Sequence, residues 1–120
     1  MKILLVDDEK KFVSMLAKRL ELRGIKVDYC YEPTSAIKNI EKGNKYDIAI
    51  LDVKMPGMSG IELKRKLSDI DPKLKFIFLT GHGSNVDYNT GISEASHYLL
   101  KPLEINDLIE VLHILVPESM

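Results

Sequence analysis

The stretch Ile48-Ala49-Ile50-Leu51-Asp52 decides the fold, because an unbroken apolar run ends directly at a carboxylate. Such a run is typical of a strand that is buried on both faces, as in a parallel sheet covered by helices. Similar short apolar or β-branched runs predict strands over residues 2–6, 25–30, 47–51, 74–79 and 97–100.

Helical patterns lie between these runs. Apolar residues at helical spacing predict helices over residues 12–20, 36–40, 59–68 and 105–115. Ser59 with Glu62 three residues later is a capping-box signature for the third of these. A helix over 84–95 contains poor helix formers such as Asn89 and Gly91, and we expect it to be short and the least stable element. Strands and helices in alternation predict an α/β fold, a doubly wound parallel sheet with five strands and five helices.

The composition excludes several classes of protein. The chain has 120 residues, of which 45% are hydrophobic and 29% charged, and its formal net charge is −1. We therefore expect a single globular domain over residues 1–120, with no electrostatic attraction to nucleic acid. Its apolar runs are far shorter than the roughly 20 residues of a spanning helix, so no membrane contact is expected. A lone Cys30 excludes an intrachain disulfide and fits the cytoplasm.

Polar side chains follow four of the expected strands. Asp7 and Asp8 follow the first strand, Asp52 the third, Thr80 the fourth and Lys101 the fifth. Any one of them has the simple explanation that strands end in wet loops. Together they predict one site, because the carboxyl ends of parallel strands meet at the ligand-binding edge of a doubly wound sheet.

This set of side chains favours phosphoryl transfer. Two carboxylates about 4 Å apart repel by roughly 4 kcal/mol at an effective dielectric constant of 20, and Lys101 compensates only part of that repulsion. A hard divalent cation such as Mg²⁺ relieves it, because Mg²⁺ prefers oxygen ligands and shares phosphate oxygens. Asp52 is alone at its strand end and fits the attacking carboxylate, which leaves Asp7 and Asp8 to hold the metal.

Four motifs resemble one family over essentially the whole chain. They are Val6-Asp7-Asp8-Glu9, Leu51-Asp52-Val53-Lys54-Met55-Pro56-Gly57-Met58-Ser59-Gly60, Leu79-Thr80-Gly81-His82-Gly83 and Tyr98-Leu99-Leu100-Lys101-Pro102. In this order and at these separations they resemble the receiver domain of response regulators in two-component signal transduction systems. The resemblance implies a flavodoxin-like sheet with strand order 2-1-3-4-5.

The resemblance also implies roles for the acidic residues and their neighbours. Asp52 is then the phosphoacceptor, Asp8 a direct ligand of Mg²⁺ or Mn²⁺, and Asp7 a ligand that acts largely through water. The backbone carbonyl of Lys54 is the third metal contact from the protein. The side chains of Lys54 and His82, each two residues beyond a site residue, are expected to tune hydrolysis of the acyl phosphate.

The remaining implied roles concern the switch. Thr80 moves to meet the phosphoryl oxygen, Lys101 pairs with it, and the ring of Tyr98 changes orientation when Thr80 moves. The Lys101–Pro102 peptide bond resembles the cis peptide of the family. The segment before Tyr98 departs from the family pattern, with Glu94-Ala95-Ser96-His97 where receivers usually have Gly-Ala-x-Asp.

The function implied is a phosphorylation switch, not an enzyme. A sensor histidine kinase or a phosphotransfer protein gives its phosphoryl group to Asp52 in a Mg²⁺-dependent reaction, and slow autodephosphorylation reverses it. The phosphoryl group switches the face formed by the fourth helix, the fifth strand and the fifth helix. That face then binds an output domain, a downstream protein or a second copy in a phosphorylation-dependent dimer.

Two alternatives from other classes remain. A haloacid-dehalogenase-like phosphatase also uses an aspartyl nucleophile and Mg²⁺, but it needs a second Asp two residues after the first, where this chain has Glu9. A flavodoxin-like carrier of FMN needs a Ser/Thr/Gly-rich phosphate loop after the first strand, which this sequence lacks. Turnover of a phosphate monoester would favour the first, and a coloured purified protein the second.

Overall fold

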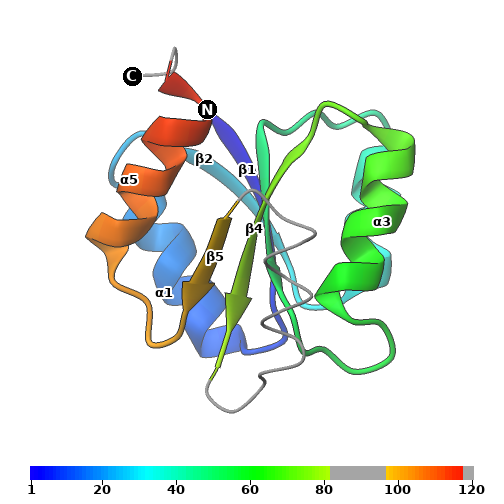
Figure 1. Cartoon of the computed structure of the whole chain (residues 1–120), viewed down its shortest axis with the longest axis horizontal. Coiled ribbons are helices and arrows are strands. Elements are labelled where there is room, and N and C mark those ends of the chain that lie inside the picture. The colour runs from blue at the N-terminus through cyan, green and yellow to red at the C-terminus, as the bar shows by residue number, and fades with distance from the viewer. Residues whose placement is uncertain (82–96, 118–120) are drawn as a thin grey trace.

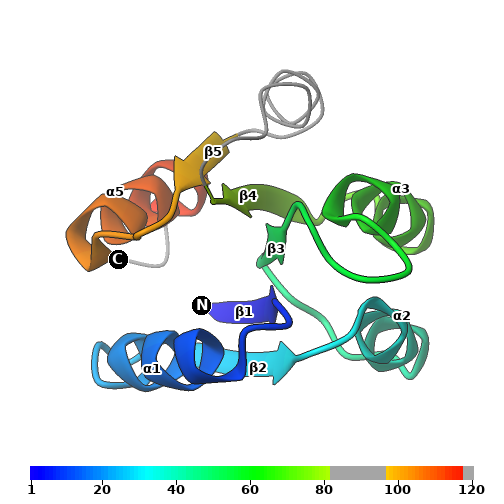
Figure 2. The same cartoon turned by 90° about the horizontal axis from the view of Figure 1, so that it is seen from below.

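The computed structural model describes residues 1–81 and 97–117. Its centre is a five-stranded parallel sheet in the order β2-β1-β3-β4-β5 (Figures 1 and 2). The strands are β1 (Lys2–Val6), β2 (Lys26–Cys30), β3 (Ile48–Asp52), β4 (Lys75–Thr80) and β5 (His97–Leu100). The predicted fold class and strand order are therefore confirmed.

Helices cover both faces of this sheet. The described helices are α1 (Lys10–Glu21), α2 (Pro33–Glu41), α3 (Gly60–Ile70) and α5 (Ile105–Leu115). Figure 2 shows α1 and α5 on one side of the sheet and α2 and α3 on the other. The helix expected over 84–95 lies outside the described residues. None of the helices in residues 1–81 and 97–117 is long and apolar enough to cross a membrane.

The core has two halves, one on each face of the sheet. Every residue of β3 is buried, and alternate residues belong to different halves. Ile48 and Ile50 pack in the cluster that includes residues of α1 and α5, whereas Ala49 and Leu51 pack in the cluster with residues of α2 and α3. This burial on both faces is why β3 reads as a continuous apolar run.

The strand ends differ by a residue from the sequence prediction, and the difference concerns the site. Pairing between β3 and β4 continues to Asp52 opposite Leu79, and pairing between β4 and β5 continues to Thr80 opposite Leu100. Asp52 and Thr80 are therefore the last residues of their strands, not the first residues of loops. Their backbones are held by the sheet, so their side chains have fixed origins at its carboxyl edge.

Candidate acidic site at the carboxyl ends of the strands

Three carboxylates converge where β1 and β3 end. Asp7 directly follows β1, Asp8 comes next, and Asp52 is the last residue of β3. Because β1 and β3 are paired neighbours, carboxylate oxygens of these three residues lie within 4.8 Å of one another. Asp7 and Asp52 are buried and Asp8 is exposed. The site thus has two acids inside the protein and one facing solvent.

Lys101 supplies the opposing charge, and it directly follows the edge strand β5. Its backbone N–H donates to the carbonyl of Thr80 at 2.7 Å, which places it at the end of β5. Its ammonium nitrogen lies 2.6 Å from Oδ2 of Asp7, 2.5 Å from Oε1 of Glu9 and 3.9 Å from Oδ1 of Asp52. The Lys101–Pro102 peptide bond is cis, as the resemblance implied.

One cavity joins these groups to Thr80. Its volume is about 330 Å³, and its walls are Asp8, Glu9, Asp52, Lys54, Thr80, Gly81 and Lys101. Thr80 is buried, and its hydroxyl donates a long hydrogen bond of 3.3 Å to the carbonyl of Gly81. The structure therefore brings together the acids, the hydroxyl and the amine that follow separate strands in the sequence.

The charges in the site are unbalanced, and the pKa values reflect it. Burial and the neighbouring carboxylate of Asp7 raise the pKa of Asp52 to about 7, although Lys101 opposes the shift. Burial also raises the pKa of Asp7, since it outweighs the contact with Lys101. Burial by itself lowers the pKa of Lys101, but its bonds to Asp7 and Glu9 outweigh that effect and raise it. Burial thus makes the carboxylates of Asp7 and Asp52 resist ionisation, while the amine of Lys101 stays charged.

The donor set fits a hard divalent cation such as Mg²⁺ or Mn²⁺. Oδ2 of Asp7 is buried, and among residues 1–81 and 97–117 it has no aligned hydrogen-bond donor beyond its ion pair with Lys101. An acceptor in that position, beside two further carboxylates, matches the oxygen ligands that these ions prefer. Asp8 is the member of the group open to solvent, which suits an ion that keeps several of its waters.

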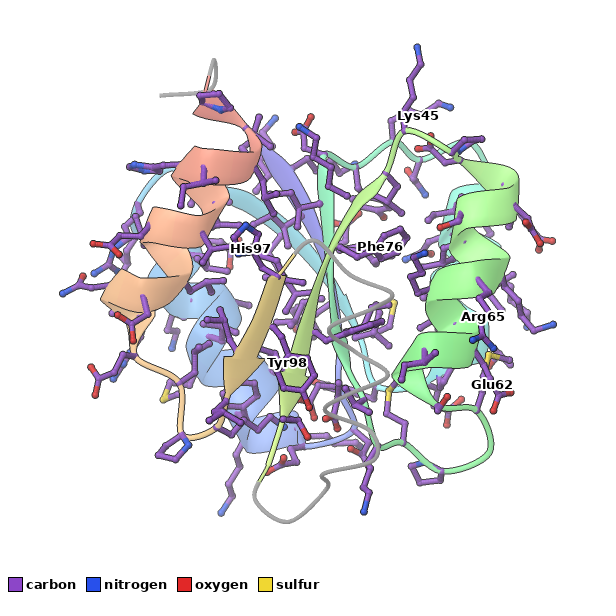
Figure 3. The ribbon with its side chains drawn as sticks, in the orientation of Figure 1. Lys45, Glu62, Arg65, Phe76, His97 and Tyr98 are labelled. Atoms are coloured by element: carbon purple, nitrogen blue, oxygen red, sulfur yellow. The ribbon has the colours of Figure 1, made fainter. Side chains whose placement is uncertain are left out.

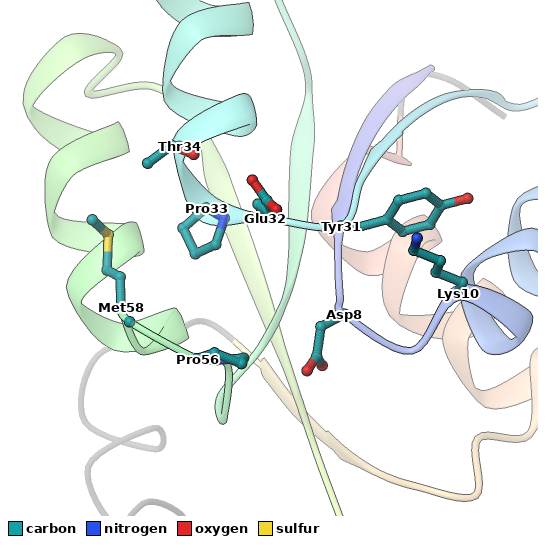
Figure 4. A pocket seen from close by; sticks show the side chains of 9 residues that line it. Asp8, Lys10, Tyr31, Glu32, Pro33, Thr34, Pro56 and Met58 are labelled. Atoms are coloured by element: carbon teal, nitrogen blue, oxygen red, sulfur yellow. The ribbon is translucent and has the colours of Figure 1, made fainter.

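A larger groove of about 440 Å³ adjoins the site (Figure 4). Two loop-to-helix junctions and the loop before α3 line it, and its walls are Asp8, Lys10, Tyr31, Glu32, Pro33, Thr34, Pro56, Gly57 and Met58. Figure 4 shows the Asp8 side chain directed toward the side of the groove where Pro56 lies, with Lys10 beside the Tyr31 ring. Asp8 is exposed and lines this groove as well as the acidic cavity, so the two adjoin at Asp8.

Tyr98, the aromatic residue expected to act in the switch, lies apart from the acidic cavity. Tyr98 is half-buried on β5 and packs against the half of the core that lies under α2 and α3 (Figure 3). It is not among the residues that line the acidic cavity. His82 lies outside the described residues. Lys54, by contrast, lines the cavity as expected of its position two residues after Asp52.

The sequence reasoning missed two residues that shape the site. Glu9 contacts Lys101, and its place directly after the acidic pair was the available signal. Gly60 begins α3 against β3, where an added Cβ would lie 2.2 Å from the carbonyl oxygen of Asp52. The signal there was a glycine at a helix start that has a good cap, since the Glu62 N–H donates to Oγ of Ser59 at 3.1 Å.

Comparison with known proteins identifies relatives that match nearly the whole chain, including the acidic site. The family model of the response regulator receiver domain matches residues 3–113. The uncharacterized transcriptional regulatory protein YkoG of Bacillus subtilis is 36% identical over 108 residues, which cover 89% of this chain and 47% of that protein. The response regulator receiver protein CpdR of Brucella abortus is 31% identical over 109 residues, 90% of each. The chain spans about half the length of most of the curated relatives compared.

A solved structure supports the same grouping. The response regulator protein TrrA of Thermotoga maritima, in complex with Mg²⁺ and BeF, is 32% identical, and the two structures superpose with a TM-score of 0.83. The match covers 95% of this chain and 97% of that one.

Proposed function

This chain belongs to the family of response regulator receiver domains, and on that premise we propose that it is a phosphorylation-dependent switch whose phosphoacceptor is Asp52. The observation that carries the proposal is the position of the Asp52 carboxylate. It is buried at the end of β3, lies 3.9 Å from the ammonium of Lys101 and shares a cavity with Thr80. A nucleophile, a cation and a hydroxyl in one cavity are the groups that phosphoryl transfer needs.

The donor is a phosphohistidine of a sensor histidine kinase or of a phosphotransfer protein. A carboxylate oxygen of Asp52 attacks the phosphorus atom, and the bond from phosphorus to the donor nitrogen breaks, so the leaving imidazole keeps that electron pair. The divalent cation would be held by Asp8, Asp7, Asp52 and the backbone carbonyl of Lys54, and it would neutralise charge on the phosphoryl oxygens. The ammonium of Lys101 pairs with one phosphoryl oxygen and the hydroxyl of Thr80 donates to another.

The conformational response starts at Thr80. Its hydroxyl makes a long hydrogen bond of 3.3 Å to the carbonyl of Gly81, and a phosphoryl oxygen offers it a better acceptor. The volume that it leaves becomes available to the ring of Tyr98, on the neighbouring strand β5. We place the resulting change on the face of the fourth helix, β5 and α5, and propose that an output domain, a downstream protein or a second copy binds there.

The domain organisation and the cellular compartment of the switch are proposed from the sequence. Residues 1–120 act as one receiver unit, and the output belongs either to a further domain or to a separate protein. Relatives named as transcriptional regulatory proteins are about twice as long as the matched segment, which supports the first arrangement. The single Cys30 fits a reducing compartment, so we place the protein in the cytoplasm.

Hydrolysis of the acyl phosphate resets the switch slowly. Lys54 lines the cavity beside Asp52, where its side chain flanks the path of an incoming water. His82, outside the described residues, is proposed to act from the other side. We expect Lys54→Ala and His82→Ala each to change the lifetime of the phosphorylated protein, and two unchanged lifetimes would contradict this role.

Phosphorylation by a small donor tests the proposal. Wild type incubated with acetyl phosphate and Mg²⁺ should gain the mass of one phosphoryl group, and Asp52→Ala should not. Asp28→Ala is the matched control, because Asp28 is a half-exposed acid on β2 that takes no part in the site. No mass gain by wild type, or an equal gain by Asp52→Ala, would contradict the proposal.

A further inference from the structure

Lys101, proposed above to bind the phosphoryl group, is already engaged in the unphosphorylated chain. Its ammonium lies 2.5 Å from Glu9 and 2.6 Å from Asp7, but 3.9 Å from Asp52. Resting on the proposed function, we propose that Glu9 is a positioning residue that competes with the phosphoryl group for Lys101. It holds the ammonium in the unphosphorylated state, and phosphorylation of Asp52 must break this contact.

Burial decides which of the two short contacts breaks. The Asp7 side chain is 0% exposed, so losing its partner would leave a buried carboxylate without solvation. The Glu9 side chain is 61% exposed, and water replaces its partner at little cost. When Lys101 turns toward a phosphoryl oxygen on Asp52, Asp7 therefore keeps its contact and Glu9 loses it.

The backbone of Glu9 is fixed for this task. Its N–H donates to Oδ1 of Asp7 at 2.9 Å, and its carbonyl accepts from the N–H of Val13 at 3.0 Å. Glu9 is the N-cap residue of α1, yet its side chain makes no capping hydrogen bond. The carboxylate instead bonds to Lys101, 92 residues further along the chain. The backbone of Glu9 is thus held by Asp7, and its carboxylate binds Lys101 instead of capping the helix.

The pair also forms a boundary between two cavities. Glu9 and Lys101 both line the acidic cavity and a second cavity of about 480 Å³, whose other walls are Phe12, Met15, Gly81, Pro102 and Leu103. The Lys101 ammonium lies 4.6 Å from the centre of the Phe12 ring, which adds a cation–π contact on the Glu9 side. Glu9 and Phe12 both line the second cavity, so neutralising Glu9 removes the charged contact on that side and frees the ammonium to move toward Asp52.

Binding of a phosphoryl analogue measures the competition directly. We expect Glu9→Gln to bind beryllofluoride with Mg²⁺ roughly 2- to 5-fold more tightly than wild type, the range expected for loss of one exposed ion pair. Glu32→Gln is the matched control. It removes the same charge from an exposed residue of the neighbouring groove that is not an ion-pair partner of Lys101, and it should change the affinity less. High salt should reduce the difference in beryllofluoride affinity between Glu9→Gln and wild type.

A second readout needs no metal or analogue. In the metal-free protein, the NMR signal of the Lys101 ammonium should shift in Glu9→Gln and stay in place in Glu32→Gln. Glu9→Asp keeps the charge on a shorter side chain, and both its shift and its beryllofluoride affinity should lie between those of wild type and Glu9→Gln.

The outcomes separate this inference from the proposed function. If wild type binds beryllofluoride but Glu9→Gln binds no more tightly than Glu32→Gln, the competition is overturned and the switch stands. An unmoved Lys101 signal in Glu9→Gln would overturn it as well. If wild type neither binds beryllofluoride nor accepts a phosphoryl group on Asp52, both proposals are overturned.

Discussion

Charged groups gather at two places in this sheet, and they are arranged in opposite ways. The carboxyl-end site consists of Asp7, Asp8, Glu9, Asp52 and Lys101. The amino-end cluster consists of Lys2, Asp28, Tyr46 and Asp47. In the amino-end cluster, Lys2 lies 3.6 Å from Asp28, and the Tyr46 hydroxyl donates to Asp28 at 2.7 Å.

Exposure and pairing distinguish the two. The side chains of Lys2 and Asp28 are 36% and 44% exposed, and Asp47 accepts a hydrogen bond from the backbone N–H of Lys2. Each acid of the amino-end cluster thus has its own donor and access to water. At the carboxyl end, Asp7, Glu9 and Asp52 share one ammonium, and the side chains of Asp7 and Asp52 are 0% and 8% exposed.

The difference separates stability from function. The amino-end cluster stabilises the fold with satisfied, exposed pairs, each of modest strength. The carboxyl-end site holds buried like charges at a cost in stability, which a bound divalent cation can offset. Acid removal should therefore stabilise the protein at one end and destabilise it at the other.

The largest expected effect is the pH dependence caused by Asp52. Its pKa is about 7 in the folded protein against 3.8 in the unfolded chain, so the folded state binds more protons between these values. The stability conferred by this group is fully present below pH 4 and is lost as pH rises through 7. The loss amounts to as much as roughly 4 kcal/mol in metal-free protein.

Asp52→Asn should remove this loss. Urea unfolding in EDTA from pH 4.5 to 8.5 should show a falling stability for wild type and a flatter profile for Asp52→Asn, which becomes the more stable protein near pH 8. Asp28→Asn, at the amino end, should keep the slope of the wild type. A variant at Asp52 that loses stability at pH 8 would show that the buried carboxylate is structural.

The next effect is stabilisation by a divalent cation. Mg²⁺ at about 100 times its dissociation constant should raise the free energy of unfolding of the wild type by roughly 2.7 kcal/mol at pH 8. Asp52→Asn and Asp8→Asn should gain little, because each removes a proposed ligand from the acidic cluster. Asp28→Asn should gain as much as wild type. An equal gain by all the variants would place the cation elsewhere.

These two expectations rest on features that the sequence made visible. Asp7, Asp52 and Thr80 each follow a run of apolar residues, so the edge of the sheet and its chemistry could be predicted together. The ion pairs that determine the charge balance of the site could not be predicted. Contacts from Lys101 to Glu9 and Asp7 join residues more than 90 positions apart, and only packing in three dimensions determines which carboxylate lies nearest.

The close packing of Gly60 against β3 also could not be predicted from the sequence. Replacement of Gly60 by alanine gives the third largest expected effect. An added Cβ would lie 2.2 Å from the carbonyl oxygen of Asp52, a backbone atom that cannot move without displacing β3. Gly60→Ala should destabilise the protein by about 2 kcal/mol. It should also lower the extent of phosphorylation by acetyl phosphate, because the carboxylate of Asp52 shifts with its backbone.

A helix-start alanine elsewhere provides the control for Gly60→Ala. Ser35 lies exposed in the first turn of α2, and Ser35→Ala should change neither stability nor phosphorylation appreciably. Unfolding by urea and intact-protein mass after acetyl phosphate treatment measure the two properties. Gly60→Ala with wild-type phosphorylation would mean that the site tolerates movement of the β3 end.

The smallest expected effect is the loss of one hydrogen bond in the amino-end cluster. Tyr46 is buried and its hydroxyl donates to the carboxylate of Asp28, so Tyr46→Phe removes one hydrogen bond and keeps the ring. The half-exposed Asp28 regains water, which limits the expected loss to about 1 kcal/mol in urea unfolding. The Mg²⁺ stabilisation and the phosphorylation of Asp52 should stay at wild-type levels. A change in either would mean that the two ends of the sheet are coupled, and the division between a stabilising end and a functional end would fail.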